Sequence, residues 1–230
     1  MIIATVGNIG SGKTVSIVKR IVESKKMSFV NFDVQAKNVL RLKKEHIVKE
    51  TVIAHTKAGK PITKREVNWK FWNRALKKYK EYHLFLDEIH NIAHSRQSMT
   101  KWNTLMSIWI SQIRKILGDS EKTHIYLISQ RIDRIDVAFR DLLHCIIHCE
   151  KFQTPNYIDT IVVEHGKKIK KMIPVTWILQ YYFTGNQCIE DYSYFLYRGT
   201  KKYKHATAFI ANPYFQYYDS YELFGETAYL

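Results

Sequence analysis

Hydrophobic and polar positions along the first 150 residues form blocks that predict strands alternating with helices. Short apolar runs rich in β-branched residues predict buried strands at 2–6, 28–33, 83–88, 124–131 and 145–149. Helices are predicted at 15–22, 71–82, 100–117 and 137–143, and the polar segment 36–48, with its scattered apolar residues, suits a short helix. Such alternation is typical of a parallel sheet covered by helices, so we expect an α/β fold with a mostly parallel central sheet.

Two further stretches predict β-hairpins. The first joins 50–56 to 62–67 through a glycine turn, inside an insertion at about 45–70. The second joins 157–164 to 169–177, and both hairpins carry several lysines. Each basic face suits either a polyanionic partner or an ordinary solvated β surface, and the sequence leaves both readings open.

The composition changes after residue 150. Tyrosine becomes frequent, helical periodicity disappears, and strand-like pieces are expected at Tyr194–Tyr197 and Ala206–Ile210. We therefore expect a core domain at 1–150 and a β-rich, basic and aromatic extension at 151–230 that packs on the core.

The strongest motif lies between the first predicted strand and the first predicted helix. It fits the phosphate-binding pattern G-x-x-x-x-G-K-[ST] and consists of Gly7, Asn8, Ile9, Gly10, Ser11, Gly12, Lys13 and Thr14. Glycines let backbone N–H groups turn inward around phosphate oxygens, and the helix N-terminus adds partial positive charge. Lys13 would reach the β- and γ-phosphates of ATP, and the Thr14 hydroxyl would be a ligand of Mg²⁺.

Two later strands end in polar residues that suit hydrolysis. The strand at 83–86 is followed by Asp87 and Glu88, the Walker B form, in which Asp87 supports the Mg²⁺ shell and Glu88 polarises the attacking water. The strand at 124–128 leads to Gln130, which can donate to the γ-phosphate or to that water. Because ligands bind at the carboxyl ends of parallel strands, we expect Gln130 and Glu88 beside the phosphate loop.

Charge and cysteine content narrow the class of protein. The 230-residue chain has 36 Lys and Arg against 21 Asp and Glu, a formal net charge of +15. This excess favours a nucleic acid or an anionic membrane surface as partner, with simple solubility as the alternative. Three cysteines do not form a disulfide framework, which favours a reducing compartment. Cys145 and Cys149 lie beside histidines, but their spacing matches buried strand residues better than a zinc site.

Taken together, the motifs resemble the FtsK–HerA superfamily of P-loop motor ATPases. The resemblance is carried by Gly7–Thr14, Leu84–Glu88, Arg114-Lys115 and Ile128–Arg131. Two branches look similar: the genome-packaging ATPases of viruses with an internal membrane, and the zonular-occludens-toxin-like ATPases of filamentous phages, which extrude DNA. The patterns at 31–38 and 218–222 lean toward the second branch. That branch generally carries a membrane helix after the ATPase domain, so the small size of this chain fits the packaging branch better.

The resemblance implies a RecA/FtsK-like three-layer P-loop NTPase fold with a β-rich C-terminal extension, assembled into a hexameric or pentameric ring. It implies that Glu88 is the general base, that Gln130 is the γ-phosphate sensor, and that Arg114 is an arginine finger for the neighbouring subunit. Arg131 and Arg140 are the alternative fingers.

The implied function is an ATP-hydrolysing motor that translocates double-stranded DNA independently of its sequence and packages a viral genome into a procapsid. A capsid, portal or membrane protein of the virus would be its partner. One alternative is DNA extrusion in filamentous phage assembly or plasmid transfer. Another, of a different class, is a nucleotide-switched assembly scaffold. The sequence shows no signal peptide and no membrane-spanning run, so we expect a location in the host cytoplasm or transiently on the virion.

Overall fold

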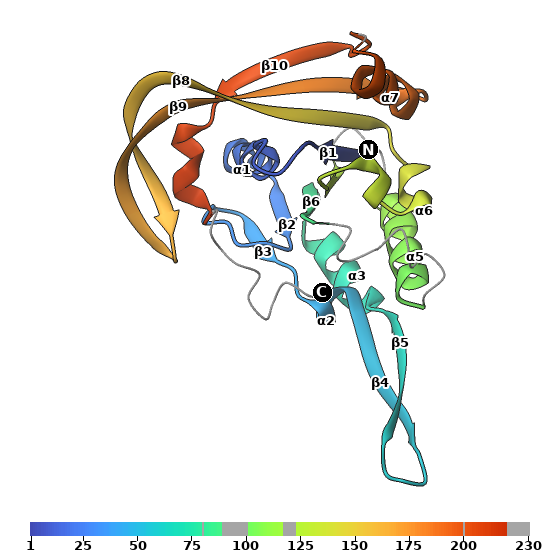
Figure 1. Cartoon of the computed structure of the whole chain (residues 1–230). Helices are drawn as coiled ribbons and strands as arrows, with labels where there is room; N and C mark the ends of the chain where they lie inside the picture. Colours follow the sequence, from blue (N-terminus) through green and yellow to red (C-terminus); the bar gives the residue numbers. More distant parts are fainter. Residues whose placement is uncertain (80, 89–100, 117–122, 200, 220–230) are drawn as a thin grey trace.

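The computed structural model describes residues 1–79, 81–88, 101–116, 123–199 and 201–219, which build one large sheet and a separate two-stranded ribbon (Figure 1). The large sheet contains β1 (Ile2–Val6), β2 (Met27–Val30), β3 (Val39–Arg41), β6 (Tyr82–Leu86), β7 (His124–Ile128), β8 (Cys145–Glu164), β9 (Lys167–Thr184) and β10 (His205–Ile210). The ribbon contains β4 (Val48–His55) and β5 (Pro61–Val67). The helices are α1 (Lys13–Glu23), α2 (Lys44–Ile47), α3 (Trp69–Lys78), α5 (Lys101–Ile116), α6 (Val137–Arg140) and α7 (Cys188–Arg198), with short 3₁₀ turns η2 (Ile132–Arg134) and η3 (Asn212–Tyr217).

The strand order of the large sheet is β10-β9-β8-β1-β7-β6-β2-β3. The strands from β8 to β3 are parallel to one another, whereas β9 is antiparallel to β8 and β10 is antiparallel to β9. Every residue of β1 and of β6 is buried, which explains their mostly apolar sequences. The expectation of a mostly parallel α/β sheet with additional C-terminal strands is confirmed.

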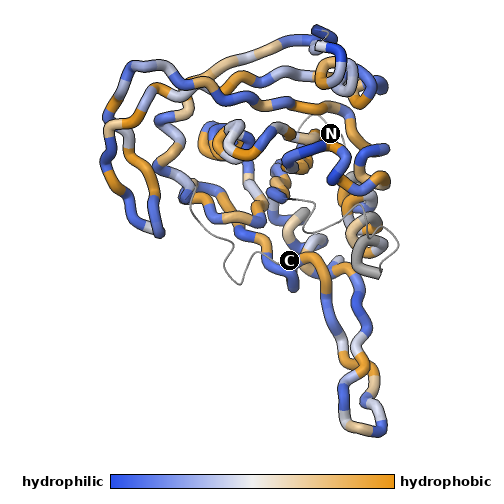
Figure 2. The backbone as a smooth tube through the Cα atoms, viewed as in Figure 1, coloured by the Kyte–Doolittle hydropathy of each residue, from blue (hydrophilic) through white to orange (hydrophobic). Residues whose placement is uncertain are grey.

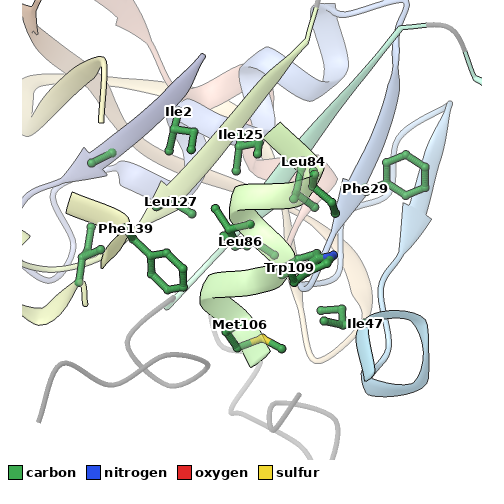
Figure 3. Close-up of a cluster of buried hydrophobic side chains, with 14 of the residues drawn as sticks. Ile2, Phe29, Ile47, Leu84, Leu86, Met106, Trp109, Ile125, Leu127 and Phe139 are labelled. Carbon is green, nitrogen blue, oxygen red and sulfur yellow. The ribbon is translucent and has the colours of Figure 1, made fainter. Parts of the chain in front are cut away.

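The sheet is packed on both faces. Alternate residues of a strand point to opposite faces, so Leu84 and Leu86 belong to one buried cluster and Phe85 to the other. The first cluster, part of which is drawn in Figure 3, includes Trp109 of α5 and Phe139 of α6. The second cluster includes the apolar face of α1. Helices therefore cover the sheet on both sides, as a three-layer fold requires.

The position of β7 decides which loops meet. This strand lies between β1 and β6 and pairs with both in parallel, with Ala4 and Leu86 each opposite Leu127. The carboxyl ends of three neighbouring strands therefore lie at one edge of the sheet. The phosphate loop follows β1, Gln130 follows β7, and Asp87 follows β6, so the sheet order alone brings the predicted site residues together.

Two hairpins extend beyond the sheet. The β8–β9 hairpin continues past the sheet and curls around the side that carries α1, with η3 packed against β8 and α1 (Figure 1). The β4–β5 ribbon projects from the opposite end of the molecule. Figure 2 shows hydrophobic positions along this ribbon, and three of those side chains are exposed: Val52, Ile53 and Ile62. Both hairpins are confirmed.

One secondary-structure prediction is right only in part and another is wrong. The segment 36–48, expected to contain a short helix, forms the four-residue α2 but also β3, because β3 completes the sheet by pairing with β2. Tyr194–Tyr197, expected as a strand, lies in α7, and helical structure therefore does continue after residue 150. Burial of Cys188 and Tyr192 on one helix face outweighs the strand propensity of the tyrosines. The helix ends at Gly199, whose φ of 64° is typical of a glycine C-cap.

The expected boundary at residue 150 lies inside β8, which continues to Glu164. The division into 1–150 and 151–230 stays a prediction. Within the described part of the chain, no helix has both the length and the apolar character that crossing a membrane requires.

Candidate active site

The loop between β1 and α1 has a conformation that only glycine tolerates at three positions. Gly7, Gly10 and Gly12 have φ angles of 148°, 73° and 90°. A Cβ atom on Gly7 would lie 2.5 Å from the carbonyl oxygen of Cys149, and one on Gly12 would lie 2.2 Å from Cδ1 of Ile178. The backbone conformation therefore favours glycine at all three positions, and the close approach of β8 and β9 also requires it at Gly7 and Gly12.

Lys13 is folded against its own loop. Its Nζ donates hydrogen bonds of 2.9 Å to the carbonyl oxygens of Gly7 and Asn8, and the side chain is buried. Burial lowers the pKa of Lys13, while the charges of Asp87 and Glu88 act in the opposite direction. The lysine charge thus lies between the phosphate loop and the two acidic residues, where a nucleotide phosphate would be placed.

Thr14 and Asp87 bring two side-chain oxygen atoms together. Thr14 Oγ1 donates a hydrogen bond of 3.0 Å to Asp87 Oδ2. Burial raises the pKa of Asp87, and the neighbouring charge of Glu88 raises it further. A carboxylate that is buried near a second acid is stabilised by a cation, and Mg²⁺ prefers hydroxyl and carboxylate oxygens. The residues present therefore fit a Mg²⁺ site.

Asn31, which follows β2, fixes the backbone of Asp87 from both sides. Its Oδ1 accepts a 2.7 Å hydrogen bond from the Asp87 N–H, and its Nδ2 donates a 2.9 Å bond to the Asp87 carbonyl oxygen. This reciprocal pair positions the carboxylate that faces Thr14. Sequence reasoning missed Asn31, although its place directly after a strand of the parallel sheet was a usable signal.

Glu88 is held in an unusual backbone conformation beside Asp87. Its φ is 48°, in the left-handed region, and its N–H donates a 2.8 Å bond to Asp87 Oδ1. Burial raises the pKa of Glu88, whereas Lys13, Arg134 and a hydrogen bond with Gln130 lower it. A carboxylate near a phosphate loop, with a raised pKa and a bound amide, has the chemistry of a general base.

Gln130 joins the phosphate loop to Glu88. Its backbone carbonyl oxygen accepts a 3.4 Å hydrogen bond from the Gly7 N–H, and its side chain is hydrogen-bonded to Glu88. Its Oε1 also accepts a 2.7 Å hydrogen bond from Nη1 of Arg134. The predicted residues Lys13, Glu88 and Gln130 therefore meet at one place. Arg134 joins them without having been predicted.

The three candidate arginine fingers lie in different settings. Arg131 forms a two-bond ion pair with Asp133, with distances of 3.0 and 2.7 Å. Arg140 is half-buried, and within the described residues its buried Nε has no hydrogen-bond partner. Arg114 lies in the last turn of α5, and its side chain lies outside the described part of the structure. The identity of the finger stays a prediction.

Two further residues approach the site from the C-terminal part of the chain. Lys151 of β8 is exposed, and its Nζ would lie 3.9 Å from a Cβ atom on Gly10. Tyr218 lies near Asp87, and burial together with the charge of Asp87 raises the pKa of its hydroxyl. Neither residue belongs to the phosphate loop or to the Asp87-Glu88 motif, because each is brought to the loop by the β8–β9 hairpin and η3.

The contacts of the cysteines and of His148 do not support a zinc site. Cys145, Cys149 and Cys188 are buried free thiols. His148 is instead hydrogen-bonded to Tyr192 and paired with Glu150. The described residues include no group of three or more His, Cys, Asp or Glu side chains arranged to hold a metal ion.

Comparisons with known proteins agree with these observations. The model of the ATPase family associated with various cellular activities (AAA) matches residues 3–151, a range that includes the phosphate loop, Asp87, Glu88 and Gln130. No curated protein sequence matches the chain significantly.

Solved structures that are similar to the chain share low sequence identity with it. The N-terminal domain of zonular occludens toxin from Neisseria meningitidis is 13% identical, with a TM-score of 0.44 over 91% of this chain and 92% of that one. The genome packaging NTPase B204 from Sulfolobus turreted icosahedral virus 2, in complex with ATP-gammaS, is 15% identical, with a TM-score of 0.40 over 67% of this chain and 76% of that one.

Proposed function

The chain belongs to the AAA family of ATPases, with a P-loop NTPase fold, and on that basis we propose that it is a Mg²⁺-dependent ATPase that translocates double-stranded DNA. The observation that supports hydrolysis best is the convergence of Glu88 and Gln130 on the Thr14–Asp87 pair. A protein that only binds nucleotide needs the phosphate loop. It does not need a half-buried glutamate whose carboxylate is hydrogen-bonded to a glutamine.

Each site residue has one task in this proposal. The loop N–H groups and Lys13 bind the phosphates of ATP, and Thr14 and Asp87 would hold Mg²⁺. When bound there, Mg²⁺ would neutralise charge that develops on the phosphate oxygens. Glu88 accepts a proton from the attacking water, and Gln130 donates a hydrogen bond that orients this water or the γ-phosphate.

The positive charge of the chain supports DNA as the polymer along which the motor would move. Several basic residues are already paired within their own hairpins, such as Arg65 with Glu50 and Lys170 with Asp159. Within the described residues, the lysines at the hairpin ends form no ion pair: Lys57, Lys60, Lys167 and Lys168. Unpaired lysines on projecting hairpins can bind phosphates without reading bases.

Assembly into a hexameric or pentameric ring is part of the proposal, because a motor needs a subunit that moves against the next. Arg114 is the first candidate for an arginine that reaches the neighbouring nucleotide. Mixing Arg114→Ala subunits with Lys13→Ala subunits should restore some ATPase activity if the arginine acts in trans.

Packaging of a viral genome into a procapsid is the proposed task, with a capsid, portal or membrane protein as partner. DNA extrusion is the second candidate. It is favoured by the segments at 31–38 and 218–222, whose sequence patterns resemble the zonular-occludens-toxin-like branch more than the packaging branch. Gln35, in the first of these segments, donates its backbone N–H in a 2.6 Å hydrogen bond to the carbonyl oxygen of Tyr217, which precedes the second.

Steady-state ATPase assays with and without double-stranded DNA test the motor proposal. DNA should raise kcat for the wild type, and Glu88→Gln should bind ATP without turning it over. Replacing Lys57 and Lys60 together by alanine, or Lys167 and Lys168 together, identifies the hairpin that contacts DNA. Lys170→Ala, which removes a lysine paired within its hairpin, is the control.

DNA affinity should decrease steeply with salt. ATP turnover that DNA does not stimulate would contradict the motor proposal and would favour a nucleotide-switched assembly scaffold.

A further inference from the structure

The side-chain amide of Gln130 is held at both of its polar ends. Its Oε1 accepts a 2.7 Å hydrogen bond from Arg134 Nη1, and its other end is hydrogen-bonded to the Glu88 carboxylate. A carboxylate only accepts and a guanidinium only donates. The amide is therefore oriented in one way, with Nε2 toward Glu88 and Oε1 toward Arg134.

This orientation is the one that phosphate recognition needs. The Nε2 group has two N–H donors, so one can remain on Glu88 while the other reaches a phosphate oxygen or the attacking water. A flip of the amide would turn Oε1 toward these negatively charged acceptors and would remove both hydrogen bonds. The Glu88 carboxylate and the phosphate oxygens are negatively charged acceptors, so Oε1 needs a cationic side chain as its hydrogen-bond donor. Arg134 is that donor, and it therefore favours the productive orientation.

The local backbone explains why Arg134 reaches Gln130 and Arg131 does not. After β7 the chain forms η2, in which the Arg134 N–H donates to the carbonyl oxygen of Arg131. The fully buried Ile135 anchors the end of this turn. The turn directs the guanidinium of Arg134 back to Gln130, whereas Arg131 is paired with Asp133 inside the same turn. Two exposed arginines three positions apart thus have different partners.

We propose that Arg134 is a positioning residue that acts within its own subunit and keeps the Gln130 amide ready for the γ-phosphate. This inference rests on the proposed ATPase function and adds to it a cationic residue outside the Walker motifs. It is distinct from the arginine finger, which would come from a neighbouring subunit.

A double-mutant cycle tests whether Arg134 acts through Gln130. Arg134→Ala should lower kcat about 10-fold, the effect of losing one charge-assisted hydrogen bond, while KM for ATP changes less than about 2-fold. The double variant Arg134→Ala with Gln130→Ala should be no slower than Gln130→Ala alone. Arg134→Lys keeps a donor and should recover most of the rate. Arg74→Ala, which removes an exposed arginine of α3, is the control and should leave the rate unchanged. Additive losses in the double variant, or an equal loss in Arg74→Ala, would overturn the proposal.

A second readout does not depend on turnover. The side-chain amide signals of Gln130 in ¹H–¹⁵N spectra of the nucleotide-free protein can be assigned from their loss in Gln130→Ala. Arg134→Ala should shift them and Arg131→Ala should not. If the wild type does not hydrolyse ATP, the proposed function fails, and the spectra still decide the role of Arg134. Unshifted signals in Arg134→Ala would refute it.

Discussion

Thr14 Oγ1 donates a hydrogen bond of 3.0 Å to Asp87 Oδ2 and so connects the start of α1 to the residue that follows β6. The two residues are 73 positions apart, and β7 lies between the strands that precede them. The contact forms only when the strand order and both loops are correct. It also marks the two oxygen atoms that are proposed to hold Mg²⁺.

Removal of the Thr14 hydroxyl should affect catalysis more than folding. Thr14→Ala should lower kcat for ATP by about 100-fold or more, since one proposed ligand of Mg²⁺ is lost. Thr14→Ser keeps the hydroxyl and should remain within about 3-fold of the wild type. ATPase rates measured across a range of Mg²⁺ concentrations, with EDTA as the zero point, give both values. Equal rates for Thr14→Ala and the wild type would show that the metal assignment is wrong.

Asn31 should contribute to both stability and rate. Asn31→Ala removes two hydrogen bonds to the Asp87 backbone and should lower the free energy of unfolding by about 1–3 kcal/mol. It should also lower kcat, because the Asp87 carboxylate is no longer fixed. Urea denaturation and ATPase assays measure the two effects. The control is Asn73→Ala, at an exposed position of α3. A variant of Asn31 as stable as that control would contradict the argument.

The glycines of the phosphate loop should differ in their tolerance of alanine. Gly12→Ala combines a φ of 90° with a clash against Ile178, whereas Gly10→Ala has a φ of 73° and meets only Lys151 Nζ, at an ordinary contact distance of 3.9 Å. Both substitutions strain the backbone. Only the first also displaces β9, so it should weaken ATP binding about 10-fold more than the second. Binding of a fluorescent ATP analogue measures this difference. Ile178→Val in the Gly12→Ala background should recover part of the affinity, and identical affinities for the two alanine variants would exclude the clash as a cause.

Local patterns predicted the features that need only neighbouring residues. The phosphate loop, the acidic pair Asp87-Glu88 and the strand before Gln130 each have a signature within a few positions. The parallel α/β order then predicted that they meet at one sheet edge, because strand ends in such a sheet share a side.

The remaining features depend on which distant segments approach one another. Nothing in the sequence distinguishes Arg134 and Lys151 from other surface residues. The η2 turn brings Arg134 to Gln130, and the course of the β8–β9 hairpin brings Lys151 to the phosphate loop. Asn31 becomes important only because β2 pairs with β6. The helix α7 was missed because its tyrosines favour strands, although Gly199 was a signal for a helix end.

His83 should make the fold sensitive to acid. Burial, and the nearby His124, lower the pKa of His83 to about 3. An unfolded histidine titrates near pH 6.5, so between about pH 6.5 and 3 the unfolded state binds a proton that the folded state does not. Stability should therefore fall as the pH drops through this range, by up to about 1.4 kcal/mol per pH unit from this residue.

Urea denaturation at pH 7 and pH 5 measures the effect of His83. In the folded protein, His83 Nδ1 accepts a 3.2 Å hydrogen bond from the His124 N–H. His83→Gln can keep an acceptor for this bond and should reduce the pH dependence. His55→Gln, at an exposed position of the β4–β5 ribbon, should not. The same slope in the wild type and His83→Gln would assign the acid sensitivity to other groups.

Lys151 should strengthen nucleotide binding from outside the Walker motifs. Its Nζ would lie 3.9 Å from a Cβ atom on Gly10, so a second ammonium group lies beside the loop that already contains Lys13. Because the Lys151 side chain is exposed, its attraction to phosphate is screened by solvent and should be modest. We expect Lys151→Ala to raise the Kd for ATP by about 3-fold at low salt and by less at high salt. Lys151→Arg keeps the charge and should bind ATP like the wild type, and Lys170→Ala, on the same hairpin but paired with Asp159, should have no effect. An unchanged Kd in Lys151→Ala at low salt would mean that this lysine does not reach the phosphates, and that β8 contributes to the site only by packing against Gly7.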